Sequence, residues 1–210
     1  MVRTRNRPIQ SESDGSAPGV SAAGHRLKGY TRLSSRVVYE NPWARLEVHD
    51  IIHPSGEPGE HTLIKNPTAS AIVAIDGEDV MFTSQRRFAI DKVVLEIPKG
   101  GAHGTEDALA TAKREAREEI GLVAEDWTSL GITYEIPSVV EQPVNLFLAQ
   151  RCRFIAATPD RVESIERVRM PLARALELAR EGGIDDAVTV VALWRAAAQL
   201  GLGTAAVERR

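Results

Sequence analysis

Residues 100–122 read GGAHGTEDALATAKREAREEIGL, and this stretch predicts a single helix with two unlike faces. Apolar residues recur at spacings of three and four, which is typical of a helix that covers a core with one face. They are Leu109, Ala112, Ala116 and Ile120. We expect the helix to span 106–120, with Thr105 as its N-cap and Gly121 closing it. Most of the stripe is small, so the helix can lie close to a sheet.

Three carboxylates share the other face of this helix. Glu115 precedes Glu118 by three residues and Glu119 by four, so the three side chains lie close together. Like charges at this spacing cost about 0.2–0.5 kcal/mol per pair, and Arg114 relieves part of that repulsion. A hard divalent cation, which prefers oxygen ligands, would relieve more. The face is therefore either a metal platform that meets a phosphorylated ligand or a solvated, charged surface.

The residues around the carboxylates favour the metal platform, because the whole stretch resembles the Nudix box. That motif is G, five residues, E, seven residues, then R-E-apolar-x-E-E-x-G-apolar. The matching positions are Gly100, Glu106, Arg114, Glu115, Glu118, Glu119 and Gly121, with Ala116 and Leu122 at the apolar positions. The resemblance implies the α+β class, a Nudix-type α/β/α sandwich with a mixed sheet. It also implies hydrolysis of a diphosphate linkage with Mg²⁺ or Mn²⁺ as cofactor.

The resemblance assigns a metal site to the box. Its ligands would be Glu115, Glu118 and Glu119, together with the backbone carbonyl of Lys99. Ions held there would neutralise the diphosphate and lower the pKa of the attacking water. Arg114 would orient the glutamates through ion pairs.

The substrate site and the general base follow from the same resemblance. Gly100 would let the chain turn close to metal and phosphate, with Gly101 beside it. In the ADP-ribose branch of the family a loop glutamate serves as base or ligand, but that position falls on Gln142 here. An amide cannot take up a proton usefully. The base therefore stays open between Glu141, one residue earlier, and Glu118.

Three features outside the box resemble the ADP-ribose pyrophosphatase branch. Pro137 lies sixteen residues after Gly121, and the segment 183–189 with the last helix resembles the C-terminal end of those proteins. The segment 85–98 carries that branch's Q-x-R and E-x-P, and there Arg87 would contact a substrate phosphate. We therefore expect a nucleotide-diphosphate substrate, ADP-ribose or a nucleotide sugar, split into a nucleoside monophosphate and a sugar phosphate.

One departure keeps other functions open. The ADP-ribose branch has P-A-G before the box, whereas this chain has P-K-G, which recurs in branches that act on dinucleoside and inositol polyphosphates. The ammonium of Lys99 suits an additional phosphate. Hydrolysis of dinucleoside polyphosphates or nucleoside triphosphates is thus the alternative activity. A nucleotide-sensing Nudix-fold module without catalysis is the alternative from another class, disfavoured by the intact glutamates.

Composition divides the 210 residues into three parts. Residues 1–27 are rich in Ser, Gly, Arg and Pro and predict a flexible tail. Alternating segments and turns predict an N-terminal strand unit over 28–66, and the hydrolase domain would occupy 67–205. In that domain we expect strands at 69–75, 80–85, 93–97, 128–135, 144–152 and 165–170, then a helix from Pro171 and a last helix capped by Asp185. Family resemblance implies a homodimer that packs through 36–65.

Charge and cysteine content narrow the partners and the compartment. A net charge of −3 without a basic stripe argues against nucleic acid. No apolar run approaches membrane-spanning length, and the arginines near the N-terminus lack the apolar stretch of a secretory signal. The lone Cys152 permits no disulfide within the chain, and its strand-like surroundings predict a structural thiol. We therefore expect a cytoplasmic protein without membrane contact.

Overall fold

The computed structural model describes residues 29–155 and 165–202, so the tail expected at 1–27 lies outside the described residues. The described residues form two compact units. The smaller contains 29–35 and 49–61, and the larger contains 36–48, 62–155 and 165–202. None of the helices in these residues is long and apolar enough to cross a membrane.

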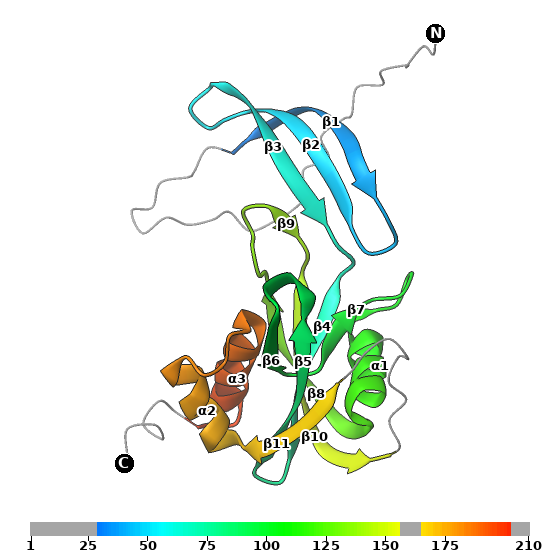
Figure 1. Ribbon diagram of the computed structural model, residues 1–210, viewed down its shortest axis with the longest axis vertical. Coiled ribbons are helices and arrows are strands. Elements are labelled where there is room, and N and C mark those ends of the chain that lie inside the picture. The colour runs from blue at the N-terminus through cyan, green and yellow to red at the C-terminus, as the bar shows by residue number, and fades with distance from the viewer. Residues whose placement is uncertain (1–28, 156–164, 203–210) are drawn as a thin grey trace. The chain divides into compact units, whose positions relative to one another are not determined.

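The chain forms its strands and helices in a mixed order (Figure 1). The first strands are β1 (Thr31–Glu40), β2 (Arg45–Ile52), β3 (Pro58–Lys65), β4 (Ala69–Asp76) and β5 (Asp79–Arg87), followed by the 3-10 turn η1 (Phe88–Ile90). The box region contains β6 (Lys92–Glu96), β7 (Lys99–Gly101), α1 (Ala108–Ile120) and β8 (Leu122–Thr133). The remaining elements are β9 (Val140–Glu141), β10 (Val144–Phe154), β11 (Glu166–Pro171), α2 (Leu172–Glu181) and α3 (Ala187–Gln199).

In the smaller unit, the turn between β2 and β3 closes where Pro and Gly predict it. His53 donates its N–H to Glu57 O (2.8 Å), and Gly56 sits in the turn at φ 96°. The ring of Tyr30 meets His53 edge-on at 5.6 Å between centroids. A Cβ on Gly59 would lie 2.2 Å from Nε2 of the same histidine, so a larger residue there would displace the ring.

In the larger unit, a mixed sheet has the strand order β11-β5-β4-β10-β8, with β6 added to β5 and β7 to β4. The central pair β4 and β10 runs parallel, while β5, β7, β8 and β11 join antiparallel. A parallel central pair needs a crossover connection, and α1 with β8 supplies it. The mixed sheet expected from the sequence is confirmed.

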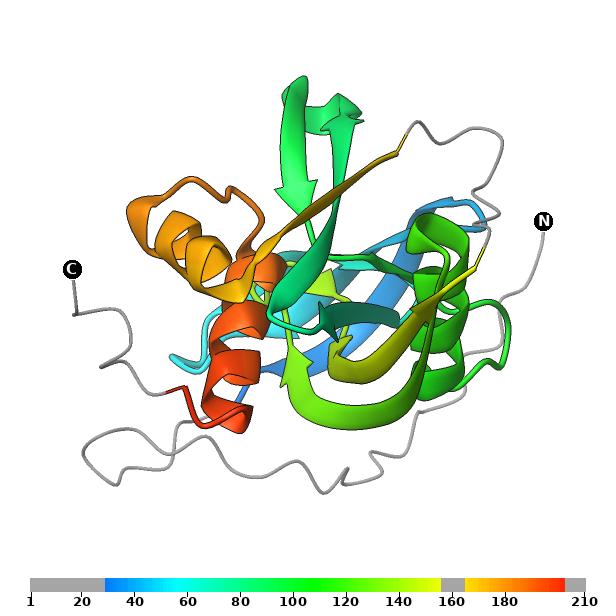
Figure 2. The ribbon, with the colours of Figure 1, turned by 90° about the horizontal axis from the view of Figure 1, so that it is seen from below.

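The central strand β4 is buried on both faces, which requires a layer on each side. Ala71 and Val73 point into a core shared with α2 and α3, whereas Ile72 and Ala74 point into a core shared with α1. All four are fully buried. Two views show α1 on one face of the sheet and α2 with α3 on the other (Figures 1 and 2). The α/β/α sandwich is thus confirmed.

Two helices begin later than the sequence predicts. The N-cap of α1 is Asp107 rather than Thr105, and its side chain accepts the N–H of Ala110 at 2.7 Å. The N-cap of α3 is Asp186 rather than Asp185. In both places the aspartate oxygen accepts an N–H of the first turn that has no partner within the helix. The predicted C-cap, Gly121, is correct, with a left-handed φ of 65°.

Two short strands were not predicted from the sequence. β7 consists of Lys99, Gly100 and Gly101, which have little strand propensity, and it exists because it pairs with Ala69–Ala71 of β4. β9 contains Val140 and Glu141 and pairs with the end of β3. Tertiary pairing, rather than the local sequence, accounts for both.

Candidate active site

Gly100 lies where β7 meets the carboxylate face of α1. A Cβ on Gly100 would be 2.1 Å from Oε1 of Glu115 and 2.3 Å from its Cδ, so any side chain here would expel this carboxylate. The glycine is required for space, not for a left-handed backbone, since its φ is not positive. Its neighbours hold it in register, because Gly100 pairs with Ser70 of β4, and Ser70 Oγ donates to Ala108 O at the start of α1 (2.7 Å).

The backbone of Lys99 contacts a second carboxylate of the helix. Its N–H donates to Oε2 of Glu119 at 3.2 Å, and Glu119 is buried, with 6% of its surface exposed. Arg167 on β11 donates to the carbonyl oxygen of Glu119 at 3.2 Å and so ties the end of α1 to the sheet. β7 and α1 are therefore in contact through both Gly100 and Lys99.

Arg114 holds the carboxylates together. Its Nη1 lies 2.7 Å from Glu115 Oε1 and 2.9 Å from Glu118 Oε2, and its Nη2 lies 3.1 Å from Glu106 Oε2. Nη2 also donates to Gly101 O at 2.7 Å. Burial opposes the charge of Arg114, but its hydrogen bonds to the glutamates outweigh that penalty and raise its pKa. The hydrogen bond from Arg114 in turn lowers the pKa of Glu106.

This group, the box cluster, consists of Arg114 with Glu106, Glu115, Glu118 and Glu119. Glu106, Glu115 and Glu118 contact the guanidinium, while Glu119 accepts the N–H of Lys99, so the carboxylates of the cluster exceed its one cation by three charges. Across 29–155 and 165–202, no three His, Cys, Asp or Glu side chains already sit in a metal-binding arrangement. The reason is visible in the contacts, because Arg114 draws Glu115 and Glu118 toward itself. The donors are nevertheless the oxygens that hard divalent ions prefer, so the residues fit such an ion in chemistry and in charge.

A cavity of about 490 Å³ opens over the box cluster. It is lined by the segment 99–104, by Arg114, Glu115, Glu118 and Glu119 of α1, and by Pro42, Trp43 and Pro67. Its size falls within the range of small-molecule sites, about 300–1,000 Å³. Trp43 is largely exposed (73%), which leaves an aromatic ring available at the rim. Phe88 and Tyr134, two further exposed aromatic residues, do not line this cavity.

Lys99 and Arg87 meet carboxylates rather than open solvent. The guanidinium of Arg87 makes a two-pronged contact with Glu96, with Nε to Oε1 at 2.9 Å, and this hydrogen bond raises the pKa of Arg87. The ammonium of Lys99 contacts Asp186 directly and lies 3.8 Å from Glu96 Oε2. We call these four side chains the pre-box cluster. Both cations were expected to bind phosphate, and both have carboxylate partners in the chain itself.

Asp186 links the pre-box cluster to the last helix. Besides Lys99, its side chain accepts the N–H of Thr189 at 2.9 Å, while Thr189 Oγ1 accepts the N–H of Ile97 at 3.0 Å. Burial acts against the charge of Asp186, but the ammonium of Lys99 and the hydrogen bonds from Thr189 prevail and lower its pKa. Sequence reasoning missed this contact, since Asp186 lies 87 residues from Lys99 and its only local signal is that of a helix cap.

The two candidates for the base after Pro137 lie in different places. Glu141 is on β9, with 56% of its side chain exposed, and its Oε2 is 3.7 Å from Lys65 Nζ. It does not line the cavity over the box cluster. Gln142 donates to Pro67 O at 2.9 Å and lines a neighbouring cavity of about 160 Å³ together with Arg87 and Lys99. Glu118, in contrast, lines the cavity over the box cluster, and 37% of its side chain is exposed.

Cys152 has the properties of a structural thiol. It is half-buried, and burial together with the charge of Asp76 raises its pKa to about 11. Because the thiolate is the nucleophilic form, a pKa this high makes the residue a poor nucleophile near neutral pH.

Known proteins share both the box and the strands before it. The family profile described as NUDIX domain matches residues 65–192, and the one described as nucleoside diphosphate sugar hydrolase N-terminal domain matches 30–64. A CMP-5'-(N-acetyl-N-hydroxy-3-aminopropyl)phosphonate hydrolase of Streptomyces rubellomurinus is 33% identical, over 81% of this chain and 82% of its own. An ADP-ribose pyrophosphatase of Bacillus subtilis is 29% identical, over 77% and 89% respectively.

The fold has solved counterparts as well. A crystal structure of an ADP compounds hydrolase superposes with a TM-score of 0.74 at 25% identity, covering 84% of this chain and 97% of the other. The match to the family profile spans more than half of the chain and contains the whole box cluster. Proteins of this family generally depend on divalent metal ions and act on nucleotide derivatives. The chain belongs to the Nudix family and is a hydrolase that acts on pyrophosphate bonds.

Proposed function

We propose that this protein hydrolyses the diphosphate linkage of a nucleoside diphosphate derivative, ADP-ribose or a nucleotide sugar, with Mg²⁺ as cofactor. The products would be a nucleoside monophosphate and a sugar phosphate. The observation that carries the proposal is the box cluster, in which carboxylates outnumber cations at the floor of a cavity of nucleotide size. Such an excess of negative charge disfavours a bare diphosphate and favours one that arrives with divalent cations.

The metal would be held by Glu115, Glu118, Glu119 and the backbone carbonyl of Lys99. Once bound, a divalent ion neutralises the diphosphate and lowers the pKa of the attacking water. Gly100 keeps room for the Glu115 carboxylate, and Arg114 restrains the glutamates against their mutual repulsion. Gly101 lines the cavity, and its carbonyl oxygen accepts a hydrogen bond from Arg114.

For the general base we propose Glu118 rather than Glu141. Glu118 faces the cavity and is less enclosed than Glu115 or Glu119, so its oxygens can reach a water molecule. Glu141 lies near Lys65 and is not among the residues that line the cavity. A base must come within hydrogen-bond distance of the proton that it removes, which favours Glu118.

The pre-box cluster supports a diphosphate rather than a longer polyphosphate as substrate. To bind an additional phosphate, the ammonium of Lys99 would have to be available, but it is already paired with Asp186 and lies near Glu96. Arg87 borders the smaller cavity with 38% of its side chain exposed, so it can still contribute positive charge to a bound phosphate. The similarity to an ADP-ribose pyrophosphatase and to an N-terminal domain of nucleoside diphosphate sugar hydrolases supports the same class.

We also propose that 28–66 acts as an N-terminal unit, 67–205 as the hydrolase domain, and that two copies pair through 36–65. Every residue of β1 is exposed, including Val37, Val38 and Tyr39, and a second copy would cover these apolar side chains. Sedimentation equilibrium over a hundredfold range of concentration tests the pairing, and a monomer throughout contradicts it. The half-buried, unbridged Cys152 suits a reducing cytoplasm.

Product analysis tests the activity. The protein is incubated with Mg²⁺ and ADP-ribose, nucleotide sugars, dinucleoside polyphosphates or nucleoside triphosphates, and products are separated by ion-exchange chromatography. We expect AMP and ribose 5-phosphate from ADP-ribose, or the matching pair from a nucleotide sugar, with Glu118→Gln inactive and Glu125→Gln fully active. Turnover of polyphosphates alone would contradict the substrate, and nucleotide binding without turnover would favour a sensor.

A further inference from the structure

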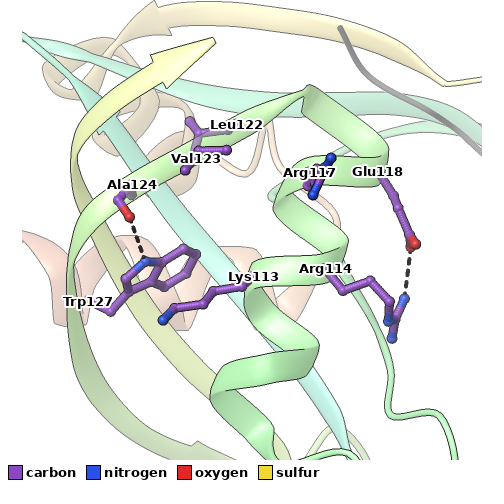
Figure 3. A pocket seen from close by; sticks show the side chains of 8 residues that line it. All are labelled: Lys113, Arg114, Arg117, Glu118, Leu122, Val123, Ala124 and Trp127. Atoms are coloured by element: carbon purple, nitrogen blue, oxygen red, sulfur yellow. Dashed lines mark hydrogen bonds and ion pairs between the residues drawn. The ribbon is translucent and has the colours of Figure 1, made fainter. Parts of the chain in front are cut away.

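A second and larger cavity, of about 570 Å³, lies between α1 and the beginning of β8 (Figure 3). One wall comes from the helix and the other from the strand. The helix contributes Lys113, Arg114, Arg117 and Glu118, and the strand contributes Leu122, Val123, Ala124 and Trp127. The proposed hydrolysis uses none of these side chains except Arg114 and Glu118, which line both cavities.

The helical wall carries two cations without an acidic partner among residues 29–155 and 165–202. Lys113 and Arg117 are four residues apart, hence one turn apart on the same face, and both are exposed. Within the part of the chain that the structure describes, neither makes a hydrogen bond or an ion pair. Arg114, between them in sequence, is already engaged by the glutamates. Two like charges at this spacing repel each other, so an anion between them would be stabilising.

The strand wall is apolar and aromatic. Trp127 donates its Nε1–H to Ala124 O at 3.1 Å, so its one polar group is satisfied inside the protein. Its ring meets Phe147 edge-on at 6.4 Å between centroids, which fixes its orientation. The side chain of Lys113 extends from α1 in the direction of Trp127 (Figure 3). What this wall offers a ligand is ring surface, with Leu122 and Val123 beside it.

We propose that this cavity is a second ligand site and that it binds a nucleoside monophosphate. The phosphate would lie between the compact ammonium of Lys113 and the planar guanidinium of Arg117, which can donate two parallel hydrogen bonds to it. The base would lie against the ring of Trp127. The volume lies within the range of small-molecule sites. This site does not depend on the proposed hydrolysis, although a ligand here would adjoin Arg114 and Glu118 of the box cluster.

Titration with AMP tests the site through a signal that belongs to it. The indole ¹H–¹⁵N resonance of Trp127 is identified as the one absent from Trp127→Phe, and AMP is added to the full chain in Mg²⁺ buffer. We expect a saturable shift of this resonance, with adenosine and inorganic phosphate each binding at least about tenfold more weakly than AMP, since each makes only part of the contacts.

The double variant Lys113→Gln/Arg117→Gln should weaken AMP binding at least about tenfold, because both charge contacts are lost. The matched control is Arg174→Gln, an exposed arginine on α2, which should bind like the wild type. Three results would overturn the proposal: no Trp127 shift, an undiminished shift in the double variant, or adenosine binding as tightly as AMP. Because the readout is binding, a failure of hydrolysis would not affect it.

Discussion

Two charged clusters lie on either side of Lys99, and they differ in their balance of charge. The box cluster contains four carboxylates and a single guanidinium, that of Arg114, which contacts three of them. The pre-box cluster matches two cations, Arg87 and Lys99, with two carboxylates, Glu96 and Asp186. Lys99 connects the two clusters, since its backbone N–H contacts Glu119 of the box cluster while its ammonium contacts Asp186.

The difference in charge balance indicates that the box cluster requires an added cation, whereas the charges of the pre-box cluster already balance one another. In the box cluster the surplus of carboxylates remains repulsive until a cation joins them, which suits a metal site. In the pre-box cluster every charge has an opposite neighbour, which suits a rigid support. The support positions Lys99 and so the turn into Gly100, where the chain must pass close to Glu115. Four substitutions test this contrast.

The largest effect should come from Glu119→Gln in the box cluster. It removes a charged oxygen donor that is buried at the floor of the cavity, so we expect kcat to fall about 10²–10³-fold with little change in the fold. Steady-state kinetics with Mg²⁺ measure the loss. The control is Glu125→Gln on β8, an exposed acid that should stay within about twofold of the wild type. A Glu119→Gln enzyme with more than a third of wild-type activity would contradict the metal role.

Arg114→Gln tests whether positive charge stabilises the carboxylates of the same cluster. Without the guanidinium the glutamates repel each other, and we expect the free energy of unfolding to fall by about 2 kcal/mol in metal-free buffer. Millimolar Mg²⁺ should restore part of the loss, because the ion supplies the missing positive charge. Urea unfolding with EDTA and with Mg²⁺ measures both. An equal loss in the two buffers would mean that the carboxylates do not form a cation site.

Asp186→Asn tests the balanced cluster. Asparagine can still cap α3, so the substitution removes mainly the charge that faces Lys99, and we expect a loss of about 1–2 kcal/mol at pH 7. The pKa of Asp186 is lower in the folded than in the unfolded chain, so its stabilisation is complete above the unfolded value of 3.8. It disappears as the pH falls through the lower, folded value.

Urea unfolding from pH 7 to pH 3 follows this dependence. The difference between wild type and variant should be constant well above pH 3.8 and shrink below it. Asp185→Asn is the matched control, since the ion pair of this neighbour with Lys92 is exposed and the substitution should change stability by less than about 0.5 kcal/mol. Equal effects of the two substitutions would show that Asp186 has no special role in stabilising the pre-box cluster.

Glu141→Gln should have the smallest effect. If Glu118 is the base, neutralising an exposed carboxylate near Lys65 should lower kcat/KM by less than about threefold. The pH profile of kcat should keep its acidic limb, which would report a base elsewhere. A loss of about 100-fold with the acidic limb abolished would instead make Glu141 the base.

Local sequence predicted most elements because hydrophobic spacing and turn residues are local signals. The helix of the box, the strands around it and the closing role of Gly121 follow from residues within a few positions of each other. The main errors concern short strands, caps and the start of β8, which lies at Leu122 rather than at 128. β7 and β9 form through pairing with distant strands, and the caps of α1 and α3 lie two residues and one residue later than the local signal predicts.

By itself, the sequence determined the carboxylate face of α1, because the spacing of residues on one helix decides which side chains share a face. Its resemblance to the Nudix box implied the family and the α/β/α architecture. Only the tertiary structure decided that Gly100 lies against Glu115 and that Asp186, 87 residues away, neutralises Lys99. It also decided that Trp127 stands opposite Lys113 and Arg117 across a cavity. These contacts join separate elements, and their geometry depends on how the helices pack against the sheet.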